Sequence, residues 1–216
     1  LLVRLNERLD GALDTALAMF DDTYPRPFFH QLVSSQLDMD RLDYLRRDSF
    51  YTGVAEGEVG VQRLLKTMRV HPLQGGPDSE VMIEAKGIYA VENFLISRRL
   101  MYWQVYLHKT VLAGDELLRG VLRRVQEHLG AGPPPDWLAR GSRALLFFLR
   151  HDIRADQIDE PTVRDHYVQL DDTDILFSLK QWMHGPDPLL ADLCRRFVNR
   201  RFLRVTFVPR SPNAAQ

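Results

Sequence analysis

Apolar residues recur every three or four positions along most of this chain, which is the spacing of one helix face. At the start of the chain the repeat predicts a helix over 2–20, which Tyr24-Pro25-Arg26-Pro27 must end because proline interrupts the hydrogen-bond ladder. By the same criterion we expect further helices over 28–33, 34–49, 59–66, 89–109, 116–128, 137–150, 160–169, 173–184 and 188–199. Pro161 and Pro188 suit the first turn of their helices.

Segments with the character of strands are few. Residues 68–73 and 81–85 have the pattern of two strands, and the Gly-Gly-Pro-Asp-Ser stretch at 75–79 between them is typical of a hairpin loop. A terminal strand is expected over 201–208, which contains Phe202, Val205 and Phe207. The predicted fold class is therefore all-α, or mainly α, with one small β-hairpin.

A change in composition divides the chain. Residues 130–135 are Gly-Ala-Gly-Pro-Pro-Pro, a short and stiff connector. We therefore expect a helical domain over 1–130, a helical C-terminal lobe with the terminal strand over 136–208, and a disordered tail over 209–216.

The composition is that of a soluble globular protein. The 216 residues are 45% hydrophobic and 26% charged, and with a formal net charge of −1 nothing indicates nucleic-acid binding. No apolar run approaches the roughly 20 residues of a membrane span, so no membrane partner is expected. The single cysteine, Cys194, excludes an internal disulfide and suits a reducing compartment, so we expect a cytoplasmic protein.

The helix predicted over 34–49 carries an unusual polar face. Ser35 and Asp38 have the Ser-x-x-Asp spacing of a helix start. At about 100° per residue, one sector roughly 100° wide holds two carboxylates, a phenol and a guanidinium. These belong to Asp40, Asp48, Tyr44 and Arg41. Short carboxylates beside a phenol suit a fixed binding site, whereas a solvated face usually carries long Lys and Glu pairs. The spacing alone leaves both interpretations open.

A second polar face follows on the helix predicted over 89–109. Arg98, Tyr102 and Tyr106 recur four residues apart, and Lys109 returns to within about 20° of Arg98. The face is either a binding surface or a packing stripe, in which the aromatic rings meet a neighbouring helix and the cations extend to water.

The first of these faces lies in a segment that resembles a known family. Residues 34–54, SSQLDMDRLDYLRRDSFYTGV, are similar to the signature that follows the metal site in HD-domain phosphohydrolases, specifically the deoxynucleoside triphosphate triphosphohydrolase (dGTPase-like) branch. Weaker similarity continues through GIYAVENFLISRRLMYWQVYLHKT and LDDTDILFSLKQW. The resemblance implies an HD-type helical core and metal-dependent hydrolysis of a deoxynucleoside triphosphate to deoxynucleoside and triphosphate.

The resemblance also implies a role for each residue of the first face. Asp40 would be the last protein ligand of a divalent metal ion, and the motif does not distinguish Mg, Mn, Fe, Ni or Zn. Arg41 would contact a substrate phosphate, Tyr44 would pack against the sugar, and Asp48 would accept a hydrogen bond from the 3′-hydroxyl.

On the second face the resemblance implies further substrate-binding residues. Arg98 would contact the phosphates, and Tyr106 would contact the sugar or base. We expect Lys109, on the same predicted face, to help neutralise the phosphate charge. Tyr102 stands where relatives carry a His, which leaves its role open.

One departure from the family is clear. The upstream His and the His-Asp pair that supply its other metal ligands are not found before Asp40. Only His30 precedes Asp40, and we expect it in a core or capping role. The dipeptide His151-Asp152 lies in a charged stretch and is expected at the surface. The sequence therefore looks like the C-terminal part of a longer protein that has its catalytic base upstream of Leu1, and the fragment alone is expected to lack turnover.

Two alternatives to this enzyme remain. One is a nucleotide-sensing or scaffold protein that keeps the fold without turnover, and the other is an HD phosphohydrolase that acts on another nucleotide. Since relatives in the family commonly assemble, a homo-oligomer is expected in each case.

Overall fold

The computed structural model of the chain describes residues 2–72, 79–130 and 132–205. The chain divides into two compact units, Leu1–Leu107 and His108–Gln216. The described residues form eleven α-helices and one two-stranded sheet, so the expected mainly α fold class is confirmed. The connector at 130–135, where composition predicts a boundary, lies inside the second unit.

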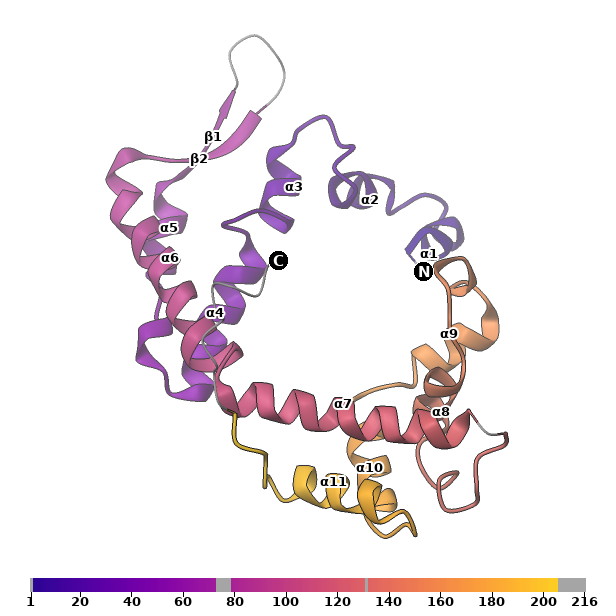
Figure 1. Cartoon of the computed structure of the whole chain (residues 1–216). Coiled ribbons are helices and arrows are strands. Elements are labelled where there is room, and N and C mark those ends of the chain that lie inside the picture. Colours follow the sequence, from indigo (N-terminus) through magenta and orange to yellow (C-terminus); the bar gives the residue numbers. More distant parts are fainter. Residues whose placement is uncertain (1, 73–78, 131, 206–216) are drawn as a thin grey trace, which may run out of the picture. The chain divides into compact units, whose positions relative to one another are not determined.

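The first unit contains the β-hairpin and the first six α-helices (Figure 1). Its elements are α1 (Leu2–Arg8), α2 (Asp14–Phe20), α3 (Phe28–Val33), α4 (Met39–Thr52), α5 (Val61–Thr67), β1 (Met68–Pro72), β2 (Ser79–Ile83) and α6 (Ile88–Met101). Short 3-10 turns lie at Ala55–Gly57 and Ala85–Gly87, and a π-helix at Tyr102–Tyr106 continues from α6. The helix predicted over 28–33 is confirmed at both ends by α3.

The prediction of one helix over 2–20 is wrong, because the backbone turns between α1 and α2. Asp10 and Gly11 have φ angles of 50° and 81°, in the left-handed region that a right-handed helix does not include. The side-chain oxygen of Asn6 accepts a hydrogen bond from the Leu13 N–H at 2.7 Å and fixes the turn. The apolar repeat thus continues across a break that spacing alone does not reveal.

Helix α4 starts at Met39 instead of residue 34, which corrects the predicted start. Asp38 is the N-cap, because its side chain accepts a hydrogen bond from the Arg41 N–H at 2.7 Å. Ser35 donates its own N–H to Asp38 at 3.2 Å, so the expected roles of this pair are reversed. At the other end Gly53, with a φ of 70°, closes the helix in the left-handed conformation that glycine favours.

The predicted hairpin is confirmed. Strands β1 and β2 pair in antiparallel fashion with Met68 opposite Ile83, and residues 73–78 of the loop lie outside the described residues. The side-chain oxygen of Gln31 on α3 accepts a hydrogen bond from the Val81 N–H at 2.7 Å. This contact attaches α3, and with it the approach to α4, to the sheet.

The core of the first unit fixes α4 against α6. Leu42 and Leu45, the apolar anchors that the sequence predicts for α4, are 3% and 0% exposed. The core cluster comprises Leu42, Leu45, Val59, Leu64, Phe94 and Met101. Because these side chains are removed from water together, the polar residues of α4 are left on a different face of the helix.

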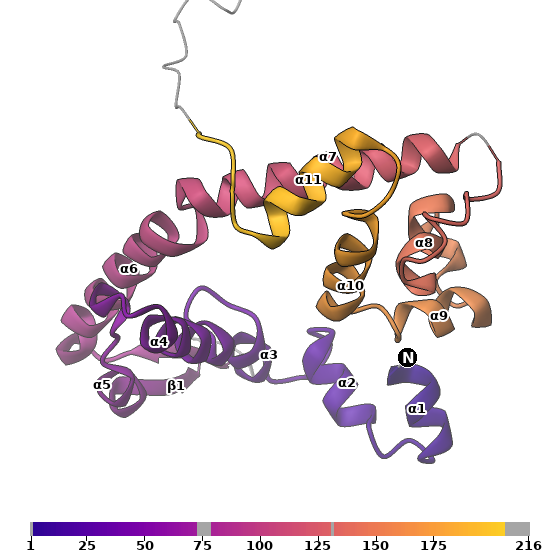
Figure 2. The ribbon, with the colours of Figure 1, turned by 90° about the horizontal axis from the view of Figure 1, so that it is seen from below.

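The second unit is built on the long helix α7 (Lys109–Leu129), against which α11 (Pro188–Val198) packs (Figure 2). Its remaining helices are α8 (Arg143–Arg150), α9 (Pro161–Tyr167) and α10 (Asp172–Trp182). Its core comprises Val121, Val125, Leu129, Leu138, Leu145, Leu179, Trp182, Leu190 and Cys194. Ser142 caps α8 by accepting the Leu145 N–H, so this helix begins at Arg143 and not at the predicted residue 137.

Pro161 and Pro188 occupy first-turn positions of α9 and α11, as predicted. The predicted terminal strand over 201–208 is not found in its described part, because residues 201–205 have no regular secondary structure. Residues 206–208 and the predicted tail at 209–216 lie outside the described residues. Phe202 packs against Phe197 instead, with ring centroids 5.9 Å apart.

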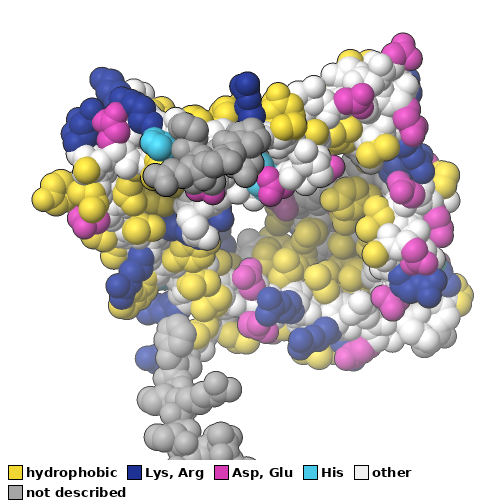
Figure 3. All heavy atoms as spheres, turned by 90° about the horizontal axis from the view of Figure 1, so that it is seen from above, with side chains coloured by type: hydrophobic (Ala, Val, Ile, Leu, Met, Phe, Trp, Pro, Cys, Tyr) yellow, Lys and Arg dark blue, Asp and Glu magenta, His cyan; other side chains and the backbone are white. Residues whose placement is uncertain are grey.

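At the surface, apolar side chains are interspersed with charged ones (Figure 3). Among the described residues of the first unit, Phe50, Tyr51 and Tyr89 are the most exposed large examples, at 80%, 79% and 79%. Within the described ranges, none of the helices combines the length and the apolar character that a membrane span requires.

Candidate functional site

Two segments far apart in the sequence meet in the first unit. Asp48 lies on α4, and Tyr106 ends the π-helix that follows α6. The Tyr106 hydroxyl donates a hydrogen bond to Oδ2 of Asp48 at 2.7 Å. The ring of Tyr44, one helical turn before Asp48, lies at a T-shaped angle to the Tyr106 ring with centroids 6.1 Å apart. Residues from both predicted polar faces therefore form one cluster, which we call the α4–α6 cluster.

Arg98 and Tyr102 extend the α4–α6 cluster. The guanidinium carbon of Arg98 lies 5.9 Å from the Tyr102 ring centroid, a cation–π distance. The Tyr102 and Tyr106 ring centroids are 5.1 Å apart, and the Tyr44 ring lies 6.1 Å from that of Tyr106. Tyr102, whose role the resemblance leaves open, thus connects Arg98 to the other two tyrosines.

The end of α6 departs from the predicted helix. The Leu107 N–H donates to the Tyr102 carbonyl at 2.8 Å, five residues back instead of the usual four. The helix stops there, and Lys109 is the first residue of α7 in the second unit. The predicted angle between Lys109 and Arg98 assumes one unbroken helix and is wrong.

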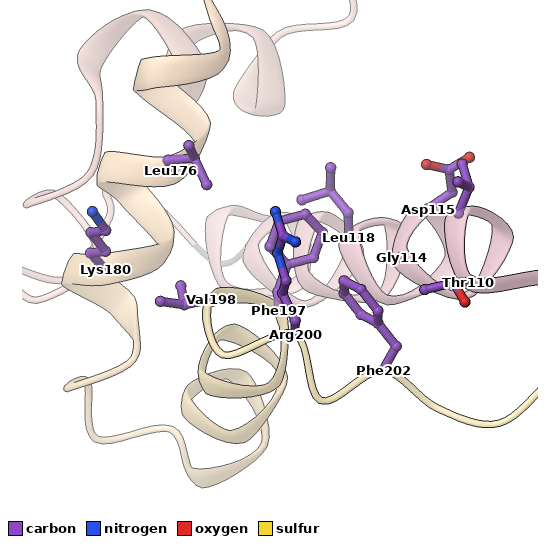
Figure 4. A pocket seen from close by; sticks show the side chains of 11 residues that line it. Thr110, Gly114, Asp115, Leu118, Leu176, Lys180, Phe197, Val198, Arg200 and Phe202 are labelled. Carbon is purple, nitrogen blue, oxygen red and sulfur yellow. The ribbon is translucent and has the colours of Figure 1, made fainter. Parts of the chain in front are cut away.

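Lys109 lines a pocket of the second unit, about 610 Å³ in volume, together with Arg200 and Arg204. A neighbouring pocket of about 660 Å³ is more apolar, and Lys180 and Arg200 lie on its walls (Figure 4). Its apolar lining includes Leu118, Leu176, Phe197 and Phe202. Both pockets are formed by residues of the second unit, so the phosphate-binding role of Lys109 stays a prediction.

Burial controls the protonation of two tyrosines in the α4–α6 cluster. Burial raises the pKa of Tyr106, and the hydrogen bond to the Asp48 carboxylate raises it further. Burial also raises the pKa of Tyr44, although the guanidiniums of Arg98 and Arg41 oppose the rise. Both hydroxyls therefore stay protonated at neutral pH, and Tyr106 acts as a hydrogen-bond donor toward Asp48.

Both arginines of the predicted site contact residues that precede α4. Nη1 of Arg41 lies 3.2 Å from Oδ2 of Asp38, and Nη1 of Arg98 donates to the side-chain oxygen of Gln36 at 3.1 Å. The sequence interpretation gave Asp38 only a role in starting the helix and did not identify Gln36. Gln36 and Asp38 both lie in the SSQLD stretch, which resembles the family signature, and this position is the only indication of a role that the sequence offers. It does not reveal the contact between Gln36 and Arg98, which are 62 residues apart.

Asp40, the predicted metal ligand, is exposed on α4. No group of three or more His, Cys, Asp or Glu side chains in the described ranges is arranged to hold a metal ion. A single carboxylate is too few ligands for a divalent-cation site, so the described residues do not fit a complete metal centre. Nδ1 of His30 lies 3.1 Å from the Met19 carbonyl, which fits its expected core or capping role, and His151 is exposed as predicted.

The chain resembles known proteins in sequence. Residues 59–133 match the family model of the HD associated region. The chain is 33% identical over 192 residues to the uncharacterised protein YwfO of Bacillus subtilis (strain 168). The aligned residues make up 88% of this chain and 40% of YwfO. It is 38% identical over 98 residues to the uncharacterised protein MJ1154 of Methanocaldococcus jannaschii. These residues make up 45% of this chain and 21% of MJ1154.

The chain also resembles a solved structure. The crystal structure of a phosphohydrolase from Bacteroides thetaiotaomicron matches it with a TM-score of 0.83 and 46% identity, over 93% of this chain and 48% of the phosphohydrolase. The chain thus spans less than half the length of these relatives. The expected resemblance to HD-type proteins is confirmed, whereas the dGTPase-like branch stays a prediction. Residues 59–133 are thus similar to the HD associated region, and the chain has a helical fold that matches that of a phosphohydrolase.

Proposed function

We propose that this chain supplies the sugar- and phosphate-binding part of a metal-dependent HD-type phosphohydrolase that cleaves a deoxynucleoside triphosphate to deoxynucleoside and triphosphate. The proposal rests on the α4–α6 cluster, in which Asp48, Tyr44 and Tyr106 meet near two guanidiniums. A carboxylate, aromatic rings and guanidiniums match the hydroxyl, the ring and the phosphates of a nucleotide. The similarity to the Bacteroides phosphohydrolase supports hydrolase chemistry.

Asp48 would bind the sugar. A carboxylate can accept hydrogen bonds on both oxygens, and the Tyr106 hydroxyl already donates to Oδ2. The other oxygen would accept the 3′-hydroxyl of the sugar. The ring of Tyr44, one turn away on α4, would pack against C2′ and exclude a 2′-hydroxyl. The proposed preference for deoxyribose depends on this contact.

Arg41 and Arg98 would bind the phosphates. A guanidinium carries five N–H donors in a planar arrangement that suits phosphate oxygens. Within the described residues, Nε of Arg41 is buried and has no hydrogen-bond partner. A phosphate oxygen would supply the missing acceptor, which is the usual requirement for a buried donor. Lys109 is proposed for the same role only on its positive charge and on its position in the sequence after Arg98.

The metal centre would be completed by protein outside residues 1–216. Asp40 offers one carboxylate, and the matched parts make up only 40% and 48% of the two longer relatives. When bound, a divalent ion would supply the Lewis acid for cleavage at a phosphate. We assign no catalytic step to the described residues, whose proposed work is to bind and orient the substrate.

Product analysis with the full-length protein tests this function. The protein is incubated with each common deoxynucleoside triphosphate and Mg²⁺ or Mn²⁺, and the products are separated by ion exchange. We expect equal amounts of deoxynucleoside and inorganic triphosphate. Release of orthophosphate or pyrophosphate would contradict the proposal and favour hydrolysis of a different kind. Binding without any product would favour the nucleotide-sensing or scaffold alternative.

A further inference from the structure

The two predicted phosphate-binding arginines are attached to one short segment. Residues 35–38, directly before α4, include Gln36 and Asp38, and each of these contacts a different arginine. We propose that Gln36 and Asp38 are positioning residues that hold Arg98 and Arg41 as a pair for a polyphosphate chain. The inference rests on the proposed function, because it assigns how the same site recognises triphosphate.

Asp38 makes more contacts than a helix cap needs. Its Oδ1 accepts the Arg41 N–H at 2.7 Å, which is the capping bond. Its Oδ2 accepts the Ser35 N–H and Nη1 of Arg41, each at 3.2 Å. The residue is 3% exposed, so these bonds replace water and fix the carboxylate. Since Asn and Ser cap helices as well as Asp does, what the second carboxylate oxygen adds is its bonds to the Arg41 guanidinium and to the Ser35 N–H.

Gln36 holds Arg98 from a different element. Gln36 is exposed in the segment before α4, whereas Arg98 lies on α6. Its Oε1 accepts Nη1 of Arg98 at 3.1 Å, while the Tyr102 ring faces the same guanidinium. This hydrogen bond uses one of the five N–H donors of the guanidinium. Because the glutamine amide is neutral, it restricts Arg98 without neutralising its charge.

The consequence is a pair of cations with limited freedom. A side chain that is already held loses less conformational entropy when a ligand binds, so its affinity is higher. Arg41 lies on α4 three residues before Tyr44, and the Arg98 guanidinium lies 5.9 Å from the ring centroid of Tyr102, so both arginines border the α4–α6 cluster. One segment thus sets the positions of two phosphate-binding groups that come from two helices.

Two variants remove the contacts and keep the fold. Asp38→Asn retains an oxygen for the helix cap but presents an NH₂ group, a donor, to the Arg41 guanidinium. Gln36→Leu removes the acceptor at an exposed position. Binding of inorganic tripolyphosphate to the full-length protein is measured by calorimetry without added metal. We expect each variant to bind about three- to tenfold more weakly than the wild type. The melting temperature should be unchanged in Gln36→Leu and lower in Asp38→Asn, because Asp38 is buried and also accepts the Ser35 N–H.

Double variants show whether the loss passes through the arginines. Gln36→Leu should weaken binding no further in an Arg98→Leu background, and Asp38→Asn should weaken it no further in an Arg41→Leu background. Gln62→Leu, at an exposed glutamine of α5, is the matched control and should bind as the wild type does. Additive losses in the double variants would overturn the inference. So would single variants with wild-type affinity, or a wild-type protein that does not bind tripolyphosphate.

The result is separable from that for the proposed function. If the protein releases triphosphate from a deoxynucleoside triphosphate but neither KM nor the tripolyphosphate affinity changes in the variants, only the inference fails. If it releases none but tripolyphosphate binding depends on Gln36 and Asp38, only the proposed function fails. When both hold, the variants raise KM more than they lower kcat, because they act on binding.

Discussion

The hydrogen bond between Asp48 and Tyr106, at 2.7 Å, orients the carboxylate that we propose for sugar binding. The raised pKa of Tyr106, caused by burial and by Asp48 itself, keeps the phenol protonated and therefore a donor. The carboxylate is thus fixed on one side by the protein and keeps acceptor capacity for a ligand. Asp40 has different surroundings on the same helix, because it is exposed. These surroundings fit separate roles for the two carboxylates, one toward the sugar and one toward a metal ion.

Asp40 is therefore tested by removing its charge. In the full-length protein, Asp40→Asn is expected to lower the bound metal content and to reduce kcat/KM at least ~100-fold, because a metal ligand is lost. Metal analysis after dialysis and a hydrolysis assay measure both effects. Asp43→Asn is the matched control, since Asp43 is exposed on α4 and forms a 2.7 Å surface ion pair with Arg47. Equal losses in the two variants would show that Asp40 has no special role.

At the scale of elements, the sequence predicts best those helices whose ends carry a proline or a turn. The bounds of α3 and the first residue of α11 agree with prediction because prolines mark these starts. The start of α4 was misplaced because a buried Asp38 carboxylate, and not the serine before it, caps the helix. The Asp10–Gly11 turn and the π-helix at Tyr102–Tyr106 were missed since both leave the apolar spacing almost intact.

The end of α4 provides a test of backbone strain. Gly53 has a φ of 70° and no heavy atom within 4 Å of an added Cβ, so Gly53→Ala would strain the backbone without a clash. We expect it to lower the free energy of unfolding by about 1 kcal/mol. Gly60→Ala is the control, because Gly60 has a φ of −72° and equally open surroundings. Urea unfolding should show a smaller loss for Gly60→Ala, whose only expected effect is that of alanine at the N-cap of α5, and a similar loss in both variants would contradict the explanation.

The contact between α7 and α11 predicts a dependence of stability on acid pH. Burial alone would raise the pKa of Asp187, but hydrogen bonds from the Leu190 N–H, His128 and Arg124 lower it to about 2. A carboxyl with a lowered pKa stabilises the fold above its unfolded pKa, and this contribution disappears as the pH falls toward the folded value. We expect a loss of about 2 kcal/mol between about pH 5 and pH 2.

Asp187→Asn should flatten this part of the stability curve, because the amide has no charge to lose. Urea unfolding followed by tryptophan fluorescence over the same pH range measures the difference. Asp192→Asn is the control on α11, since Asp192 is exposed and pairs only with Arg196 among the ion pairs of the described residues. An Asp187→Asn variant with the wild-type pH dependence would show that this carboxyl does not control acid stability.

At the scale of the whole molecule, the limits of sequence reasoning differ between fold and site. Helical spacing predicts the two polar faces, yet it contains no information on whether they meet, and the structure brings Asp48 and Tyr106 into contact across 58 residues. In the structure Lys109 also lies on a new helix, because the π-helix that continues from α6 ends at Tyr106. The described residues contain no group of three or more side chains that could hold a metal ion, so our proposal takes the other ligands from outside them.

The preference of the full-length protein for deoxyribose over ribose is the most direct test of the proposed function. The Tyr44 ring and the Asp48 carboxylate lie one turn apart on α4, so both can contact one small ring. If Tyr44 excludes a 2′-hydroxyl by contact, the full-length protein prefers a deoxynucleoside triphosphate to the matching ribonucleotide. Tyr44→Ala should then narrow the difference between the two by improving use of the ribonucleotide. Asp48→Ala should weaken both substrates by about 1–3 kcal/mol, because both offer a 3′-hydroxyl. The measurement is kcat/KM for a matched deoxynucleoside and ribonucleoside triphosphate with the wild type and both variants. Equal use of the two substrates by the wild type would rule out the triphosphohydrolase assignment.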